Sequence, residues 1–181
     1  MIVIDHHIED ECLTDYFFIE GVIDINSEYF IEKIKRGFQE DNNMAFKTNI
    51  RDLMTSYNYF NNDDEFSKIL KHFIKYIDER IKLNTYTLQD SWGYCVRTGN
   101  KTQVHTHKPS IWSGVLYLND HSQLLNFPDI KRKVKPEKGK FALFSSFLNH
   151  GCKKHKSKET KWGISFNLSS TFMGADVGKK D

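Results

Sequence analysis

The chain has few cysteines and no long apolar run, and both features exclude whole classes of protein. Its 181 residues include only three cysteines, Cys12, Cys95 and Cys152. An odd number at wide spacing supports neither a disulfide framework nor a CxxC-type zinc site, so we expect reduced thiols. No apolar run approaches the roughly 20 residues that cross a bilayer. The sequence therefore predicts a protein without a membrane-spanning segment.

The opening residues lack the features of a secretory signal. MIVIDHHIEDECL is acidic where a signal peptide has a basic region followed by a long apolar stretch, so we expect a cytoplasmic protein. The length suits one domain, and no repeat or low-complexity linker divides the chain. We expect a single domain over 1–181, with a helical and strand support region at 1–88, a β core at 89–172 and a tail at 173–181.

Positive charge is concentrated in one part of the chain, although the net charge is only +2. The segment from Lys131 to Lys161 holds eleven Lys or Arg residues against Glu137 and Glu159. Such a tract is commonly a solvated rim on long loops. It is also suited to nucleic acid or another anionic partner.

Helical patterns occur in the first half of the chain. Asn26 or Ser27 can cap a helix over residues 28–39, whose apolar residues recur at helical spacing. A stronger helix is predicted to begin after Asp63 or Asp64 and to run to Ile81, with one apolar stripe that packs on a sheet. Before both helices, residues 16–25 (YFFIEGVIDI) indicate a strand or a bent pair of strands.

From Ser91 onward the sequence consists of short β-type runs separated by turn residues. The runs are SWGYCVRT, TQVHTH, SIWSGVLYLN, KFALFSSF and KWGISFNLSS. Several short antiparallel strands predict a sandwich or barrel, and the mouth of such a fold commonly holds a ligand. The sequence therefore predicts an α+β protein with a mainly β core.

Histidines in two of these runs form a candidate metal site. His105 and His107 lie two residues apart, so on a strand both imidazoles would leave the same face and reach one ion. His150 follows an apolar strand and a turn, at a plausible strand end. Three ligands on one side of an ion leave positions open for substrate and oxygen, as non-haem iron chemistry requires. The other loop histidines, His121 and His155, are expected to be solvated.

Several segments together resemble a family of small 2-oxoglutarate and Fe(II)-dependent oxygenases, related to prolyl hydroxylases and frequent in bacteria and phages. The segments are Ser91-Trp92, VHTHKPSIWSGVLYLND, FALFSSFLNHG and KWGISFN, with a looser likeness over residues 43–53. The resemblance implies a distorted double-stranded β-helix, or jelly roll, with the N-terminal helices packed on one sheet. It also implies Fe(II), 2-oxoglutarate and O2 as the reagents, with His105, His107 and His150 as the metal ligands.

One position departs from the pattern of the prolyl-hydroxylase relatives. Their motif is HxD followed by a distant His, whereas this chain has His107 in place of the aspartate. An imidazole in place of a carboxylate removes one negative charge from the site, which should weaken Fe(II) binding. His107 is the preferred third ligand, and Asp120 in LYLND is the alternative carboxylate.

The resemblance also implies a site for the cosubstrate. Lys161 occupies the place of the basic residue that pairs with the C5 carboxylate of 2-oxoglutarate, and Tyr117 matches a tyrosine that hydrogen-bonds the same carboxylate. By the two-residue period of a strand, Ser165 and Asn167 share the face of Lys161, so we expect them to contribute. Trp92 and Tyr94 are candidates to line the pocket, although packing explains them equally well.

The sequence thus supports a 2-oxoglutarate-dependent hydroxylase of unidentified substrate, which could be a protein side chain, a nucleic acid or a small metabolite. Two alternatives stay open. A three-histidine iron dioxygenase that needs no 2-oxoglutarate would explain the HxH spacing but not Lys161. A non-catalytic basic barrel that binds nucleic acid or protein would explain the basic tract.

Overall fold

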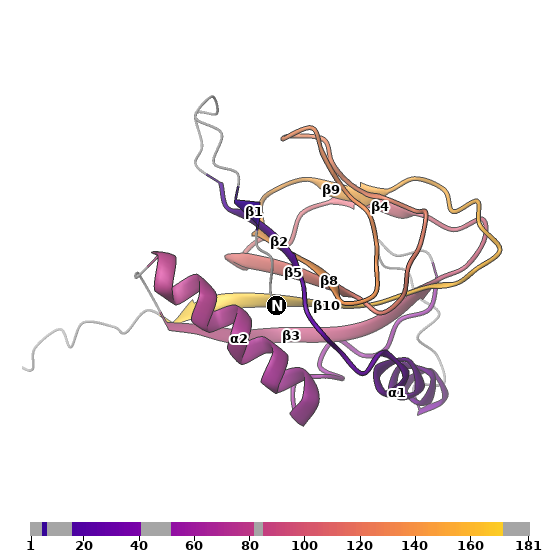
Figure 1. Cartoon of the computed structure of the whole chain (residues 1–181), viewed down its shortest axis with the longest axis horizontal. Helices are drawn as coiled ribbons and strands as arrows, with labels where there is room; N and C mark the ends of the chain where they lie inside the picture. Colours follow the sequence, from indigo (N-terminus) through magenta and orange to yellow (C-terminus); the bar gives the residue numbers. More distant parts are fainter. Residues whose placement is uncertain (1–4, 7–15, 41–51, 82–84, 172–181) are drawn as a thin grey trace, which may run out of the picture.

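The computed structural model describes residues 5–6, 16–40, 52–81 and 85–171, which form two sheets and two helices (Figure 1). All strand pairs are antiparallel. The larger sheet has the strand order β1-β2-β8-β5-β10-β3, and the smaller has the order β4-β9-β6-β7. The strands are β1 (Asp5–His6), β2 (Phe18–Val22), β3 (Thr85–Val96), β4 (Thr102–His105), β5 (Trp112–Tyr117), β6 (Leu125–Phe127), β7 (Arg132–Val134), β8 (Lys140–Ser145), β9 (His150–Cys152) and β10 (Lys161–Thr171).

The two helices begin at capped ends, close to where the sequence predicts them. Helix α1 spans Ser27–Glu40, and the Asn26 side chain accepts a hydrogen bond from the backbone N–H of Tyr29 at 3.2 Å. Helix α2 spans Asp64–Ile81, and Asp63 accepts from the backbone N–H of Phe66 at 2.7 Å. Both contacts satisfy an N–H group that has no partner within its helix, so they define the first turn.

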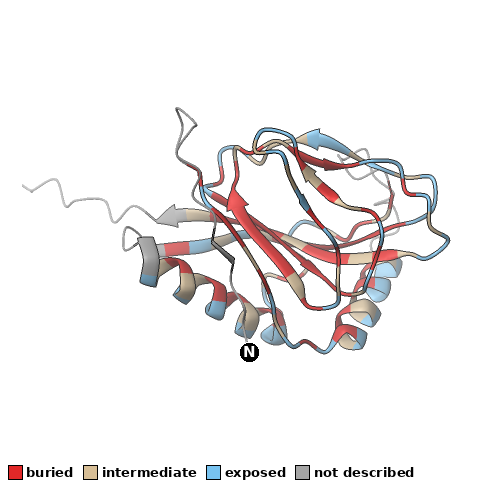
Figure 2. Ribbon diagram, turned by 45° about the horizontal axis from the view of Figure 1, so that its top comes forward, coloured by how far each residue is buried: buried red, intermediate tan, exposed pale blue. Residues whose placement is uncertain are grey.

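An apolar layer joins these helices to one face of the larger sheet. The buried residues of both helices face the strands, as the red side of each helix in Figure 2 shows. The layer is built from α1 (Phe30, Ile34), α2 (Phe66, Leu70, Phe73, Ile77) and strands of the larger sheet (Ile19, Trp112, Leu116, Phe141, Leu143, Ile164, Phe166, Leu168). The helices therefore support the sheet from the side opposite to the smaller sheet.

A second apolar cluster lies on the other face of the larger sheet, between it and the smaller one. It includes residues of the larger sheet (Phe18, Trp92, Tyr94, Val96, Val115, Tyr117, Ala142, Phe144) and of the smaller sheet (Leu125, Phe127, Val134, Cys152). Alternate residues of one strand supply the two clusters, because successive side chains leave opposite faces. The predicted alternation along β10 is confirmed, since Ile164 and Phe166 belong to the first cluster.

The predicted fold class is confirmed: the molecule is mainly β, with two helices on one sheet of a jelly roll. The sequence did not predict the short strands β6, β7 and β9, because three residues carry too little alternation to form a recognisable pattern. The predicted tail at 173–181 and most of the segment 43–53 lie outside the described residues.

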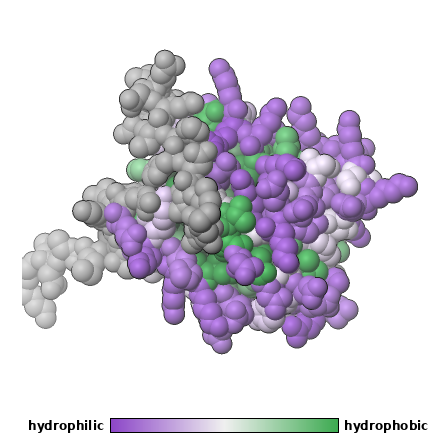
Figure 3. All heavy atoms as spheres, in the orientation of Figure 1, coloured by the Kyte–Doolittle hydropathy of each residue, from purple (hydrophilic) through white to green (hydrophobic). Residues whose placement is uncertain are grey.

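The molecular surface seen in Figure 3 is mostly hydrophilic. Neither of the two helices in the described ranges is long and apolar enough to cross a membrane. Of the cysteines, Cys95 and Cys152 are free and buried, and Cys12 lies outside the described residues.

Candidate metal centre

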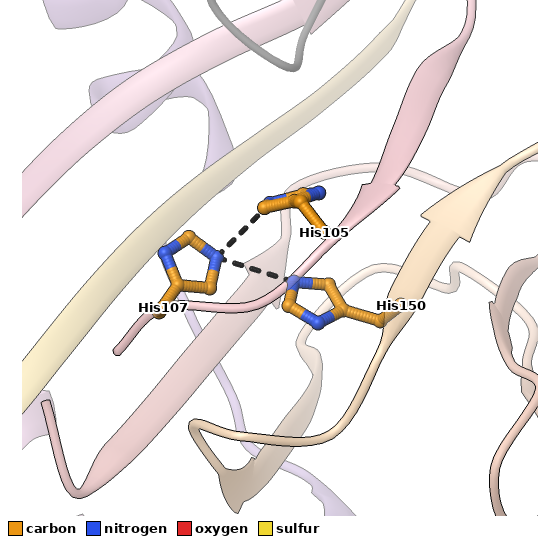
Figure 4. A group of neighbouring side chains, drawn as sticks. All are labelled: His105, His107 and His150. Atoms are coloured by element: carbon orange, nitrogen blue, oxygen red, sulfur yellow. Dashed lines mark hydrogen bonds between the residues drawn. The ribbon is translucent and has the colours of Figure 1, made fainter. Parts of the chain in front are cut away.

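Three imidazoles meet at one point between the two sheets (Figure 4). His105 ends β4, His150 begins β9, and the two are paired across these strands. His107 lies in the loop after β4. The Nε2 atom of His107 is 3.2 Å from the Nε2 atoms of both His105 and His150. Two ligand atoms about 2.1 Å from one ion and at roughly right angles lie about 3 Å apart, so this spacing suits a shared cation.

Hydrogen bonds to the backbone fix the orientation of two of the rings. The Nδ1 atom of His105 lies 2.7 Å from the carbonyl oxygen of Gln103, and that of His150 lies 2.9 Å from the carbonyl oxygen of Leu148. A carbonyl only accepts, so each Nδ1 carries the proton and each Nε2 presents a lone pair. His107 has at most one Nε2 proton and can satisfy only one of these lone pairs. A cation between the rings would satisfy all three, so the residues present fit a metal ion.

The site favours neutral imidazoles. Burial, and to a smaller extent the neighbouring His105, lowers the pKa of His107 to about 4. Burial, with smaller contributions from His105 and His107, lowers the pKa of His150 to about 3. Burial also lowers the pKa of His105. Metal binding requires the deprotonated ring, so near neutral pH protons compete weakly with a metal at this site.

Acidification is expected to destabilise the metal-free protein. Unfolding returns His107 and His150 to an ordinary pKa near 6.5, so the unfolded chain takes up more protons as the pH falls below that value. The stabilisation is therefore complete above pH ~6.5 and is lost as the pH falls towards the folded pKa values. Between pH 7 and pH 5 the loss should reach about 2 kcal/mol for each buried imidazole. Urea unfolding of chelator-treated protein at both pH values measures it.

The matched variant for that measurement is His107→Gln, which removes one titrating ring and keeps a polar side chain. It should lose clearly less stability between pH 7 and pH 5 than the unsubstituted protein. An equal loss in both proteins would show that these rings do not control the acid response.

His107 does not reach the cluster from a strand. The prediction that His105 and His107 leave one face of a continuous strand is wrong, because β4 ends at His105. A loop positions His107, and its backbone N–H donates to the carbonyl oxygen of Ser146 at 2.8 Å. The alternative ligand, Asp120, is exposed and accepts from the backbone N–H of Lys138 at 2.7 Å. Within the described ranges the potential metal-binding group contains the three histidines and not Asp120.

The histidines line a pocket of about 270 Å³ that also contains a buried lysine. Lys161 opens β10, and its side chain is only 1 % exposed. Its Nζ lies 3.4 Å from the Cys152 sulfur, and it forms no ion pair with any residue that the structure describes. A buried amine without a carboxylate partner is costly, so the pocket fits an anion at this position. Lys161 therefore does not belong to the exposed face of the basic tract.

Two tyrosines flank β10 close to Lys161. Tyr117 on β5 and Tyr94 on β3 both pair with Gly163, from opposite sides. A Cβ atom at Gly163 would lie only 2.6 Å from the Tyr94 hydroxyl oxygen, so glycine permits this ring to cover the strand. Burial is the main cause of the raised pKa of each phenol, which keeps both as neutral hydrogen-bond donors. Ser165 also lines the pocket.

The remaining predicted residue, Asn167, lies six residues beyond Lys161 on the same strand face. It lines the pocket and donates to the carboxylate of Asp90 at 2.7 Å. Trp92 and Tyr94, which the sequence offers as candidate lining residues, both line the pocket. Asp90 and Tyr57 line it as well, and neither was predicted from the sequence. Asp90, Trp92 and Tyr94 alternate along β3, so the two-residue period could have identified the carboxylate.

The expectation that His121 and His155 are solvated is wrong. Their side chains are buried, at 4 % and 2 % exposure, with ring centroids 4.3 Å apart. The two loops that carry them fold against each other, and the Gln123 side chain donates to the carbonyl oxygen of Lys153 at 2.7 Å. Loop residues are usually exposed, and only the contact between two distant loops makes these an exception.

Comparison with known proteins identifies this fold. No protein-family model matches the chain, and no curated protein matches it either. Among solved structures, a viral collagen prolyl hydroxylase from Paramecium bursaria Chlorella virus-1, in complex with 2-oxoglutarate, has a TM-score of 0.67 at 16 % identity, over 86 % of this chain and 96 % of the other. A Pseudomonas putida prolyl-4-hydroxylase has a TM-score of 0.64 at 14 % identity, over 85 % and 92 %.

A third similar structure is HygX from Streptomyces hygroscopicus with nickel and 2-oxoglutarate bound. Its TM-score is 0.63 at 12 % identity, over 87 % of this chain and 83 % of the other. Similarity at such low identity identifies an architecture and not an activity. The chain therefore has the jelly-roll fold of these three solved structures.

Proposed function

We propose that this protein is an Fe(II)- and 2-oxoglutarate-dependent oxygenase that hydroxylates its substrate. The observation that supports this most is the presence of two features in one pocket: three converging imidazoles, and a buried lysine without a carboxylate partner. A metal ion fits the first feature and a dicarboxylate fits the second. The solved structures with this fold include complexes with 2-oxoglutarate and with nickel.

In this proposal His105, His107 and His150 hold the iron, and Lys161 binds the distal carboxylate of 2-oxoglutarate. When bound, the iron and 2-oxoglutarate reduce O2, placing one oxygen atom on a substrate C–H and the other in succinate, with loss of CO2. An amine–carboxylate contact in a partly dry pocket is stronger than a neutral hydrogen bond. Tyr94 and Tyr117, whose phenols stay neutral, both pair with Gly163, two residues from Lys161, and in this proposal they donate to the same carboxylate.

Apolar side chains hold the centre rigid and exclude water. The ring of His150 packs against Phe144, with centroids 4.7 Å apart, and against Phe127 at 5.6 Å. Trp92 lies beside His107, at 6.0 Å. Packed neighbours and backbone hydrogen bonds restrict each ring to one orientation, which preorganises the ligand set.

The buried Lys161 also favours the 2-oxoglutarate-dependent oxygenase over a three-histidine dioxygenase that does not use 2-oxoglutarate. Such an enzyme has no need for a buried amine at the inner end of its pocket.

The basic-barrel alternative depends on exposed lysines in the basic tract. The exposed lysines are Lys131, Lys133, Lys135, Lys138, Lys153, Lys154, Lys156 and Lys158. We propose them as a surface for an anionic partner, such as nucleic acid, whose binding would weaken with salt.

Anaerobic titration tests the oxygenase proposal. Adding 2-oxoglutarate to the Fe(II)-loaded protein is expected to produce a metal-to-ligand absorption band, and admitting oxygen should then form succinate. Zinc-loaded protein serves as the control, because a d10 ion gives no such band. If Fe(II) binds and 2-oxoglutarate produces no band, the three-histidine dioxygenase becomes the better proposal.

A further inference from the structure

The pocket is longer than a metal ion and a five-carbon diacid require. Lys161, Ser165 and Asn167 all line it from one face of β10. Lys161 and Asn167 are six residues apart, which corresponds to about 20 Å along a strand. Ser165 pairs with Trp92, whose ring lies beside His107. The histidine cluster therefore lies between the Lys161 end and the Asn167 end of the pocket. The end at Asn167 is therefore free for a second molecule.

A fixed carboxylate lies at that end. Asp90 pairs with Asn167 in the β3–β10 register and accepts a hydrogen bond from its side-chain amide at 2.7 Å. The Ser113 hydroxyl in turn donates to the amide oxygen of Asn167 at 2.7 Å. This chain of contacts crosses three neighbouring strands. A register shift directly beyond Asn167 marks a β-bulge, a feature that commonly occurs next to active sites.

Asp90 has no cationic partner among the residues that the structure describes. It is partly buried, and burial raises the pKa of its carboxyl group. Its hydrogen bond to Asn167 occupies one oxygen only. Lys108 also lines the pocket, but its side chain is exposed and forms no ion pair with Asp90. A partly buried carboxylate with a free oxygen is a favourable position for a bound cation.

Aromatic rings stand beside this carboxylate. Tyr57 is 47 % exposed and packs edge-to-face against Trp92, with ring centroids 5.2 Å apart. Both rings line the pocket. The Trp92 indole N–H is buried and has no hydrogen-bond partner among the described residues, so it is available to an oxygen atom of a bound molecule. A carboxylate beside aromatic faces is an arrangement that recognises organic cations.

We propose that the Asp90 end of the pocket binds the primary substrate through a cationic nitrogen, an ammonium or guanidinium group, with Tyr57 and Trp92 as its walls. The proposal rests on the oxygenase function above, because it assigns the other half of the same pocket. It narrows the substrate class to molecules or peptide side chains with a positive charge near the carbon that is oxidised.

Calorimetric titration with matched pairs of probes tests this. L-arginine is compared with its neutral isostere L-citrulline, and L-lysine with L-norleucine, on Fe(II)-loaded protein with 2-oxoglutarate under anaerobic conditions. A charge-assisted hydrogen bond predicts that each cationic probe binds about 10-fold or more tightly than its neutral counterpart. Equal affinities within both pairs, or no binding by arginine or lysine, would overturn the proposal.

Three variants locate the effect. Asp90→Asn keeps an oxygen that can accept from Asn167 and removes the charge, so it should abolish the preference for the cation. Asp24→Asn makes the same change at an exposed position outside the pocket lining and should leave the preference intact. Tyr57→Leu should lower the affinity for L-arginine by about 2- to 5-fold, because the cation–π contact is lost. A preference that survives Asp90→Asn contradicts the assignment.

The experiment separates this proposal from the one on which it depends. The absorption band with 2-oxoglutarate, measured on the same samples, reports the oxygenase site alone. A band without charge-selective binding defeats only the Asp90 assignment. Charge-selective binding without a band supports the cation site and defeats the proposed oxygenase function.

Discussion

Replacing His107 by alanine is expected to lower the affinity for Fe(II), or for Mn(II) as a stable probe, by at least about 100-fold. The Nε2 atom of His107 lies 3.2 Å from those of both other histidines, so its loss leaves only two ligands. Protein ligands to a divalent ion act together, and a two-imidazole site retains little of the affinity. Calorimetric titration of chelator-treated protein with Mn(II) measures the change.

His107→Asp distinguishes the role of charge from that of ligand number. A carboxylate at this position restores the HxD pattern of the prolyl-hydroxylase relatives and adds a negative charge beside a divalent cation. Binding of Mn(II) should therefore be at least as tight as in the unsubstituted protein. Asp120→Asn is the matched control and should leave the affinity unchanged, because Asp120 is exposed and lies outside the histidine cluster. Weak binding in the Asp120 variant with normal binding in His107→Ala would identify Asp120 as the third ligand.

Replacing Lys161 by methionine is expected to have opposite effects on ligand binding and on stability. Affinity for 2-oxoglutarate should fall by about 10- to 100-fold, the value of one charge-assisted hydrogen bond. The ligand-free protein should become more stable by about 1–3 kcal/mol, since a buried amine without a carboxylate partner is replaced by an apolar chain of similar length. Titration of the absorption band and urea unfolding measure the two effects.

Weaker binding of 2-oxoglutarate together with higher stability distinguishes a ligand-binding lysine from a structural one. A lysine with only a structural role would lose stability when replaced, and its loss would not change the affinity for the diacid. Lys158→Met is the control, because Lys158 is exposed and lies outside the pocket lining. It should change neither quantity. Lower stability together with unchanged binding of 2-oxoglutarate in Lys161→Met would contradict the assignment of this residue.

Features that depend on a local residue pattern can be predicted from the amino-acid sequence alone. Helical spacing with Asn26 and Asp63 at the caps placed both helices to within a residue or two. Alternation along β10 placed Lys161, Ser165 and Asn167 on the pocket face. The HxH spacing and the segments that resemble a known oxygenase family indicated the three histidines as candidate ligands.

Contacts between distant segments, in contrast, follow from the folded chain and cannot be predicted from local pattern. His150 reaches His105 through the pairing of β9 with β4, and three-residue strands carry no signal of their own in the sequence. The burial of His155 against His121, and the position of Asp90 at the far end of the pocket, likewise depend on contacts between segments far apart in the chain. Periodicity reports which face of an element is apolar, but the partner of that face is chosen by packing across the whole molecule.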